Sequence, residues 1–267
     1  MHVSFFVWCN RKPRTKTANI YLELMLPSEA CPFLIYGLNF CFTDISLWRR
    51  WMGLRMLKVK LFEVGMLATN CYVANCTETK EAVVIDPGFG SQREADEIVS
   101  FISENGLKLK YIVNTHGHPD HTCGNGLVRS RFNVQICVHE ADAYMFGESG
   151  KSVARYFGFD CVSPAADILL RDGDSVKFGG VNLKVLHSPG HSAGSIMLLG
   201  EKEVFTGDTL FAGSIGRTDF PGSSERDVYL SLKKLLGLPD FFVVYPGHGP
   251  VTTVGEEKRG NPFLLGL

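Results

Sequence analysis

The chain has 267 residues, of which 45% are hydrophobic and 21% are charged, with 27 basic and 28 acidic side chains. This apolar content excludes an intrinsically disordered chain, and a formal net charge of -1 gives no basic surface for binding nucleic acid. The length suits one large domain or two small ones, and either can bury the core of an enzyme.

Residues 1–55 differ in composition from the rest of the chain. They contain all three tryptophans, and seven basic against three acidic side chains give them a net charge of +4, whereas residues 56–267 have a net charge of -5. Their apolar stretch at 31–42 is too short to span a bilayer, so no transmembrane segment is predicted. We interpret residues 1–55 as an N-terminal extension that is disordered, a targeting sequence, or translated sequence upstream of a start at Met56.

Residues 56–267 are predicted to form one domain that is rich in strands. Apolar or alternating runs that stop at Gly, Pro or Asn predict strands within 57–64, 70–76 and 81–88. A helical spacing of apolar residues predicts a helix at 91–105, and residues 111–114 read as a buried strand. Later strands are predicted at 135–138, 181–187, 196–199, 203–206 and 242–245, with a helix at 226–236.

Four candidate metal ligands stand within six residues after the predicted strand at 111–114, in the run Thr115-His-Gly-His-Pro-Asp-His121. Alternate side chains of an extended chain point the same way, so His116 and His118 can bind one ion. Asp120 and His121 follow a proline that can open a helix, where they can face a second ion. A single histidine is more often a structural residue, but the density of this run favours metal binding.

Three further candidate ligands follow predicted strands: His191 in Ser188-Pro-Gly-His-Ser192, Asp208 in Thr206-Gly-Asp-Thr209, and His248 in Pro246-Gly-His-Gly249. Loops at strand ends are where a rigid scaffold presents functional side chains. Together with the first four residues they form a mixed imidazole and carboxylate set, which suits Zn, Fe or Mn.

The eight cysteines are scattered and form no C-x-x-C pair, which argues against a zinc knuckle or a thioredoxin-like site. A chain of this length does not need disulfide bonds for stability, so we interpret all eight as reduced thiols. Reduced thiols predict a cytoplasmic protein, with mitochondrion or plastid as alternatives if residues 1–55 are a transit peptide.

The seven candidate ligands resemble those of the metallo-β-lactamase superfamily, and within it the short glyoxalase II-like hydrolases. Further resembling stretches lie at 82–88, 207–211, 216–220 and 256–263, so the resemblance covers about residues 56–267. It implies an α+β fold, a four-layer αβ/βα sandwich of two mixed β-sheets flanked by helices, with the metals at one edge. It implies nothing about residues 1–55.

The resemblance also implies how the ligands are shared between two divalent ions. One ion would be bound by His116, His118 and His191, the other by Asp120, His121 and His248, and Asp208 would bridge them. Zinc is the first expectation, with iron or manganese as alternatives. His139 and His187 are left as structural residues. Asp86 is interpreted as a turn former that supports the site from behind.

A binuclear site of this kind implies a hydrolase. The expected reaction is thioester cleavage, converting an S-2-hydroxyacylglutathione such as S-lactoylglutathione to glutathione and a 2-hydroxy acid by a hydroxide that bridges the metals. A thiolate leaves readily because a thiol pKa is about 8.5, so no strong general acid is needed. Asp120 is the candidate catalytic residue, because its carboxylate can orient the hydroxide as well as bind metal.

Arg217 is the candidate substrate-binding residue. Long glyoxalase II proteins hold glutathione through a C-terminal helical region and a Lys-x-Tyr stretch, where this chain reads Gly216-Arg-Thr-Asp-Phe220. The guanidinium of Arg217 suits a substrate carboxylate, and a structural salt bridge with Asp219 is equally compatible with the sequence. The acyl group, the thiol and the oligomeric state are left open.

Other reactions fit parts of the pattern. The main alternative is a persulfide dioxygenase of the same superfamily, in which two histidines and one carboxylate bind a single iron. The full ligand set and the Pro-Gly-His-Gly form around His248 favour the hydrolase. A non-catalytic binding module would be expected to have lost ligands, and lactone or β-lactam hydrolysis would use the same hydroxide.

Overall fold

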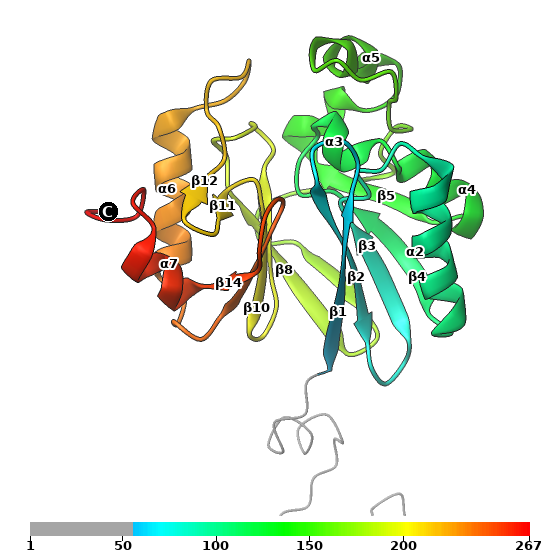
Figure 1. The fold of residues 1–267 in the computed structure, drawn as a ribbon, viewed down its shortest axis with the longest axis horizontal. Coiled ribbons are helices and arrows are strands. Elements are labelled where there is room, and N and C mark those ends of the chain that lie inside the picture. The colour runs from blue at the N-terminus through cyan, green and yellow to red at the C-terminus, as the bar shows by residue number, and fades with distance from the viewer. Residues whose placement is uncertain (1–55) are drawn as a thin grey trace, which may run out of the picture. The chain divides into compact units, whose positions relative to one another are not determined.

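Two mixed β-sheets face each other in the structure, a computed structural model that describes residues 56–267 (Figure 1). The first sheet has the strand order β1-β2-β3-β4-β5-β6. Its strands are β1 (Leu57–Val64), β2 (Thr69–Cys76), β3 (Glu81–Ile85), β4 (Lys108–Val113), β5 (Gln135–His139) and β6 (Ile168–Leu170). Strands β1 to β3 pair antiparallel, and β3 to β6 pair in parallel.

The second sheet has the order β14-β13-β10-β9-β8-β7. Its strands are β7 (Ser175–Phe178), β8 (Val181–His187), β9 (Ile196–Leu199), β10 (Glu203–Gly207), β13 (Val243–Pro246) and β14 (Thr252–Thr253). Only β10 and β13 pair in parallel among these described strands. A small hairpin of β11 (Leu210–Phe211) and β12 (Ser214–Ile215) follows β10.

Helices cover the outer face of each sheet (Figure 1). Helices α2 (Gln92–Glu104) and α4 (Asn125–Phe132) lie on the first sheet, and α6 (Glu225–Leu236) and α7 (Val254–Gly260) lie on the second. One buried cluster fills the space between the sheets, and one lies under each helical layer. This arrangement confirms the predicted α+β class and the four-layer αβ/βα sandwich.

The helix ends follow from their capping residues. Helix α2 begins after Ser91, whose hydroxyl accepts a hydrogen bond from the backbone N–H of Glu94, and it buries the predicted face of Ala95, Ile98 and Ile102. Helix α6 begins in the same way after Ser224. Both helices therefore lie within two residues of their predicted bounds.

Three short helical segments lie near the sheet edge, and the sequence predicted only the start of the first. They are α3 (Pro119–Thr122), the 3₁₀-helix η1 (Glu140–Met145) and α5 (Gly147–Tyr156). Helix α5 contains two glycines and buries only Gly150 and Ala154, so its sequence has weak helix propensity and no wide apolar face. Only the opening of a helix at Pro119 was expected, and the structure confirms it.

The prediction that all cysteines are reduced is wrong for Cys123 and Cys161. These two residues form a disulfide bond, with their Cα atoms 5.4 Å apart. They are separated by 38 residues, and only the packing of the loop after α3 against the loop after α5 brings them within bonding range. Cys71, Cys76 and Cys137 are buried and free, as predicted. The compartment stays a prediction.

Among residues 56–267, no helix is long and apolar enough to cross a membrane. The predicted extension at 1–55, with its candidate targeting function, lies outside the described residues. Residues 56–267 form one compact unit. That they make up a single hydrolase domain stays a prediction.

Candidate metal centre

The seven candidate ligands follow the ends of four strands at one edge of the sandwich. Strand β4 leads into the run 115–121, while β8, β10 and β13 lead to His191, Asp208 and His248. Backbone hydrogen bonds join these loops, from Ile196 N–H to the Thr115 carbonyl at 2.8 Å and from Gly247 N–H to the Gly207 carbonyl at 2.8 Å. Ligands from both sheets therefore converge on one place.

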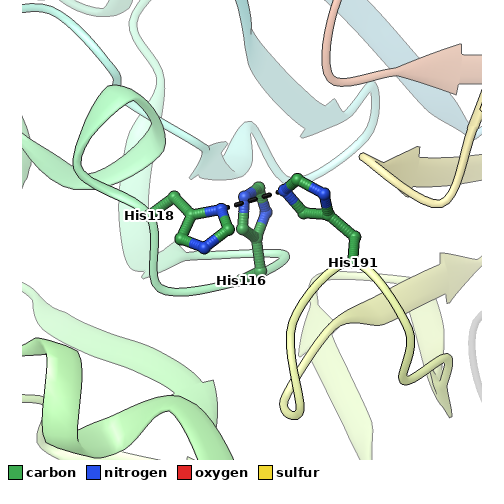
Figure 2. Close-up of side chains that lie close together, drawn as sticks. All are labelled: His116, His118 and His191. Atoms are coloured by element: carbon green, nitrogen blue, oxygen red, sulfur yellow. Dashed lines mark hydrogen bonds between the residues drawn. The ribbon is translucent and has the colours of Figure 1, made fainter. Parts of the chain in front are cut away.

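Three histidines form the first group of candidate ligands. Figure 2 shows the rings of His116 and His118, from the loop after β4, and of His191, from the loop after β8, pointing toward one another. His118 Nδ1 lies 2.9 Å from His191 Nε2. Each residue offers one ligand atom, and these atoms all lie within 4.8 Å of one another. All three side chains are buried.

Asp120, His121 and His248 form the second group. His121 Nε2 lies 3.2 Å from His248 Nε2, and the Asp120 Oδ2 atom lies 3.5 Å from the first and 3.4 Å from the second. Asp208 lies between the two groups, with Oδ1 at 3.3 Å from His121 Nε2 and Oδ2 at 3.5 Å from His191 Nε2. The structure thus brings together all seven predicted ligands.

The second nitrogen of four of these histidines is held by another group. His191 Nδ1 lies 2.8 Å from the Arg217 carbonyl, and His248 Nδ1 lies 3.1 Å from the Leu67 carbonyl. His121 Nδ1 lies 3.1 Å from Asp86 Oδ2, and His116 Nδ1 lies 3.2 Å from the Thr115 hydroxyl. These contacts fix the ring orientation and leave the Nε2 atoms facing the centre, an arrangement typical of metal-binding histidines.

Burial keeps His116 and His118 of the first group uncharged. It lowers the pKa of His116 well below its usual value, and the neighbouring His121 and His118 lower it further. Burial, together with His191, also lowers the pKa of His118 to about 3. Both imidazoles are neutral at pH 7, which is the state in which a ring nitrogen can bind a metal.

The second group contains opposing charges. Burial opposes a charge on His121, but Asp208, Asp120 and Asp86 outweigh it and raise the pKa of His121 well above its usual value. Burial likewise opposes ionisation of Asp208, but His121 and His191 hold its pKa well below the usual range. The three carboxylates are a concentration of buried negative charge, which a cation can neutralise.

The residues fit divalent metal ions. In the part of the chain that the structure describes, His116 Nε2 and Asp208 Oδ1 are buried side-chain atoms without a hydrogen-bond partner. An unpaired buried polar atom costs free energy, and metal coordination satisfies both. Ligand nitrogens about 2.0–2.1 Å from a tetrahedral zinc lie about 3.3 Å apart. His121 Nε2 and His248 Nε2 lie 3.2 Å apart, and His118 Nδ1 and His191 Nε2 lie 2.9 Å apart.

Asp86 lies behind the centre, as the sequence predicted. Its carboxylate accepts hydrogen bonds from the N–H of Thr115 at 2.7 Å and from the Thr115 hydroxyl at 2.6 Å. Together with its contact to His121, this fixes the start of the ligand run relative to β3. Gly247 is required for a different reason, because a Cβ there would collide with the ligands Asp208 and His121.

Asp142 is a supporting residue that sequence reasoning missed. Its buried carboxylate accepts hydrogen bonds from Gly117 N–H at 2.8 Å, from the Ser192 hydroxyl at 2.7 Å and from Gly194 N–H at 2.7 Å. Gly117 separates the first two ligand histidines, and Ser192 follows the third. Asp142 therefore ties the two loops of the first group together. It lies in a segment without a motif, so no sequence signal marked it.

Arg217 lies at the rim of the centre. Its guanidinium donates two hydrogen bonds to Asp219, at 2.9 and 2.7 Å, and lies 4.4 Å from the centre of the Phe220 ring. The structure thus shows the salt bridge that the sequence left as the alternative. The Arg217 carbonyl contributes to the centre through its contact with His191.

His139 and His187 do not join the ligand groups. Their rings stack on each other with centroids 4.0 Å apart, which agrees with the structural role predicted for them. Instead, Phe157 and Phe220 lie against the centre. The Phe157 ring centroid is 4.6 Å from that of His118, and neither aromatic residue was predicted as part of the site.

Comparison with known proteins identifies the family. A model of the metallo-beta-lactamase superfamily matches residues 64–248, which include all seven candidate ligands. The chain belongs to this superfamily. The glyoxalase II-like resemblance also fits the relatives. The chain is 39% identical over 215 residues to a protein named hydroxyacylglutathione hydrolase GloC from Haemophilus influenzae, across 75% of this chain and 97% of that protein.

Two further superfamily members show the range of the relatives. The chain is 35% identical over 219 residues to the mitochondrial persulfide dioxygenase ETHE1 of Homo sapiens, across 79% of this chain and 77% of that protein. The solved structure of TTHA1623 in a di-iron-bound form matches with a TM-score of 0.68 and 35% identity, across 77% of this chain and all of that one. Membership thus supports a metal-binding enzyme of the hydrolase superfamily.

Proposed function

We propose that the protein is a thioesterase of glyoxalase II type that uses two divalent metal ions, zinc being the first expectation and iron or manganese the alternatives. Its substrates are small-molecule thioesters, with S-2-hydroxyacylglutathione as the leading class. The single observation that carries the proposal is the convergence of two ligand groups on one centre, with Asp208 between them.

The residues divide the work as follows. His116, His118 and His191 would hold one ion, Asp120, His121 and His248 the other, and Asp208 would contact both. When bound there, two metal ions would supply an activated water and would polarise the thioester carbonyl. Asp120 has a side chain that is 14% exposed, so its carboxylate can accept a hydrogen bond from the attacking water and orient it. The thiolate leaves without a protein acid because a thiol pKa is only about 8.5.

The similarity to a protein named hydroxyacylglutathione hydrolase supports this reaction. Persulfide dioxygenase activity is the second candidate, because the chain is also similar to human ETHE1. A single iron needs two histidines and one carboxylate, which one group would supply. The second group of Asp120, His121 and His248 has that composition. The three histidines of the first group, with Asp208 between the groups, form a further set of ligands that a one-iron enzyme does not need, and this supports two ions and the hydrolase.

One experiment separates the two candidates. The full-length protein is purified, its bound metals are measured by elemental analysis, and it is tested for thiol release from S-lactoylglutathione and for oxygen uptake with glutathione persulfide. We expect two metal ions per chain, thiol release and no oxygen uptake. Oxygen uptake with one iron per chain would replace the proposal by the dioxygenase, and thiol release that survives complete metal removal would exclude a metal-dependent thioesterase.

A further inference from the structure

A small pocket opens beside the metal centre, on the side of His118. Its volume is about 230 Å³, and the residues that line it include His118, Tyr144, Val153, Tyr156, Phe157 and Pro221. Most of this wall comes from α5 and from the ends of its flanking segments. Helix α5 lies beyond the edge of the first sheet (Figure 1), so it adds a wall to the centre without belonging to the sandwich.

The rings that form the pocket also contact the candidate ligands. Phe157 packs against His118 with centroids 4.6 Å apart, and Phe220 packs against Phe157 at 5.0 Å. Phe220 in turn lies 6.0 Å from the ring of His191. A group bound in the pocket therefore lies next to His118, one of the first-group histidines, beside the centre at which the proposed reaction would take place.

The pocket is apolar and has exposed aromatic residues at its mouth. Apart from His118, none of the residues in the described part of the chain that line it carries a charge. Tyr156 and Tyr144 are 63% and 49% exposed. Exposed aromatic surface beside a reactive centre indicates a binding site, because burying such rings against a ligand removes apolar area from water. The nearby guanidinium of Arg217 is engaged by Asp219.

The uncharged, apolar lining determines whether the pocket suits the acyl group or the thiol of a thioester. A thiol such as glutathione carries two carboxylates and an ammonium group, which need charged partners when they leave water. Uncharged aromatic walls provide none, so the pocket suits the acyl half. A cavity of about 150 Å³ can hold benzene, so a pocket of about 230 Å³ has room for a phenyl ring or a branched alkyl group.

We propose that this pocket binds the acyl side chain of the substrate, and that the enzyme prefers thioesters whose acyl group carries an aryl or branched alkyl substituent. The inference rests on the proposed thioesterase function and narrows its substrate class. It assigns Val153, Tyr156 and Phe157 as residues that determine acyl specificity, with no part in metal binding.

The test compares S-mandeloylglutathione with S-lactoylglutathione, which share the thiol and the 2-hydroxyl group and differ by a phenyl in place of a methyl group. We expect kcat/KM of the full-length protein to be at least about tenfold higher for the mandeloyl substrate, because even one methylene in an apolar pocket gives about tenfold discrimination. Val153→Trp fills the pocket and is expected to lower kcat/KM for the mandeloyl substrate by at least about tenfold relative to kcat/KM for the lactoyl substrate, which abolishes this preference.

Val99→Trp is the matched control, because Val99 is also a half-buried valine on a helix, α2, outside the pocket lining. A second readout does not require turnover: calorimetry of mandelate and lactate with the purified metal-loaded protein. We expect mandelate to bind about tenfold more tightly, and Val153→Trp to remove the difference.

The outcomes separate the two proposals. Equal kcat/KM for both thioesters, or a preference that Val153→Trp and Val99→Trp change alike, would overturn the acyl pocket and leave the thioesterase in place. If no thioester is hydrolysed but mandelate still binds preferentially and Val153→Trp abolishes that binding, the thioesterase proposal fails and the pocket is supported as a site for aryl acids.

Discussion

The two sheets contribute to the metal centre in different ways. The first sheet supplies four candidate ligands on one loop, residues 116–121 after β4, whereas the second sheet supplies one ligand after each of β8, β10 and β13. The four ligands of the first sheet lie within six consecutive residues of the chain. The second set exists only when three strands of the sheet are in place, so the centre depends on the whole sandwich being folded.

The contacts that hold the two sets also differ. The ligand loop of the first sheet is fixed by Asp86, which contacts both Thr115 and His121, and its far end is covalently tied through Cys123. The loops of the second sheet are fixed by single hydrogen bonds that His191 and His248 donate to backbone carbonyls, and by the hydrogen bonds that Asp142 accepts. This difference suggests how the centre can be disrupted from either side.

The largest effect is expected from Asp208, the second-sheet residue that contacts both groups. In Asp208→Ala we expect bound metal to fall from two ions to at most one per chain. Thioesterase kcat/KM should fall at least about 1000-fold, because metal stabilisation of a developing charge is worth several kcal/mol. Elemental analysis and thiol-release kinetics measure both. Asp96→Ala, an exposed carboxylate on α2, is the control, and unchanged metal content in Asp208→Ala would contradict a shared ligand.

The next effect concerns the covalent tie on the first-sheet side. Removing the bond between Cys123 and Cys161 by Cys161→Ala is expected to lower the free energy of unfolding by about 3–4 kcal/mol, because a loop of 38 residues regains conformational entropy in the unfolded chain. Urea denaturation measures the change, and a reductant should shift the wild type by a similar amount. If reductant leaves the wild-type midpoint unchanged, the disulfide contributes nothing to stability.

These two predictions concern features that differ in how far the sequence predicted them: Asp208 was recognised as a candidate ligand, and the disulfide bond was not. The run from His116 to His121 was visible because its ligands are neighbours in the chain. His191, Asp208 and His248 were recognisable because each follows a strand in a Gly-containing loop. The layers of the sandwich followed from the family resemblance, and apolar periodicity gave the positions of α2, α6 and most of the longer strands, but it missed the short strands β6, β7 and β14 and the helices α4 and α7.

Three other features depend on tertiary packing: helix α5 with the aromatic residues at its end, the disulfide bond, and the contacts of Asp142. Apolar periodicity therefore did not reveal them. Helix α5 has few buried residues, and Phe157 and Tyr156 carry no ligand chemistry that would mark them. The pairing of Cys123 with Cys161 and the three hydrogen bonds to Asp142 join segments 25 to 52 residues apart. Such contacts are set by how the sheets and loops pack, and a single sequence does not encode them as a local pattern.

A smaller effect is expected from Asp142, which ties the loop of His118 to that of His191. In Asp142→Asn at least one buried donor loses its acceptor, which costs about 1–3 kcal/mol of stability. Metal affinity should fall about 10–100-fold, because residues that orient ligands tune binding by that amount. Competition with a chelator measures the affinity. Asp167→Asn is the control because Asp167 accepts a backbone hydrogen bond away from the centre, and an equal loss in that variant would show a purely structural role.

The smallest effect is expected from Arg217, at the rim of the second-sheet side. Its side chain is 66% exposed and already paired with Asp219, and exposed ion pairs of this kind contribute little to stability. Arg217→Ala should therefore leave thermal stability unchanged and alter KM for S-lactoylglutathione by no more than about twofold. Asp219→Ala removes the partner of the guanidinium. If the freed Arg217 then binds the substrate carboxylate, KM should fall in this variant. A KM more than about tenfold higher in Arg217→Ala would instead make Arg217 the residue that binds the substrate carboxylate, as the sequence suggested, and place that part of substrate recognition beside the aromatic pocket.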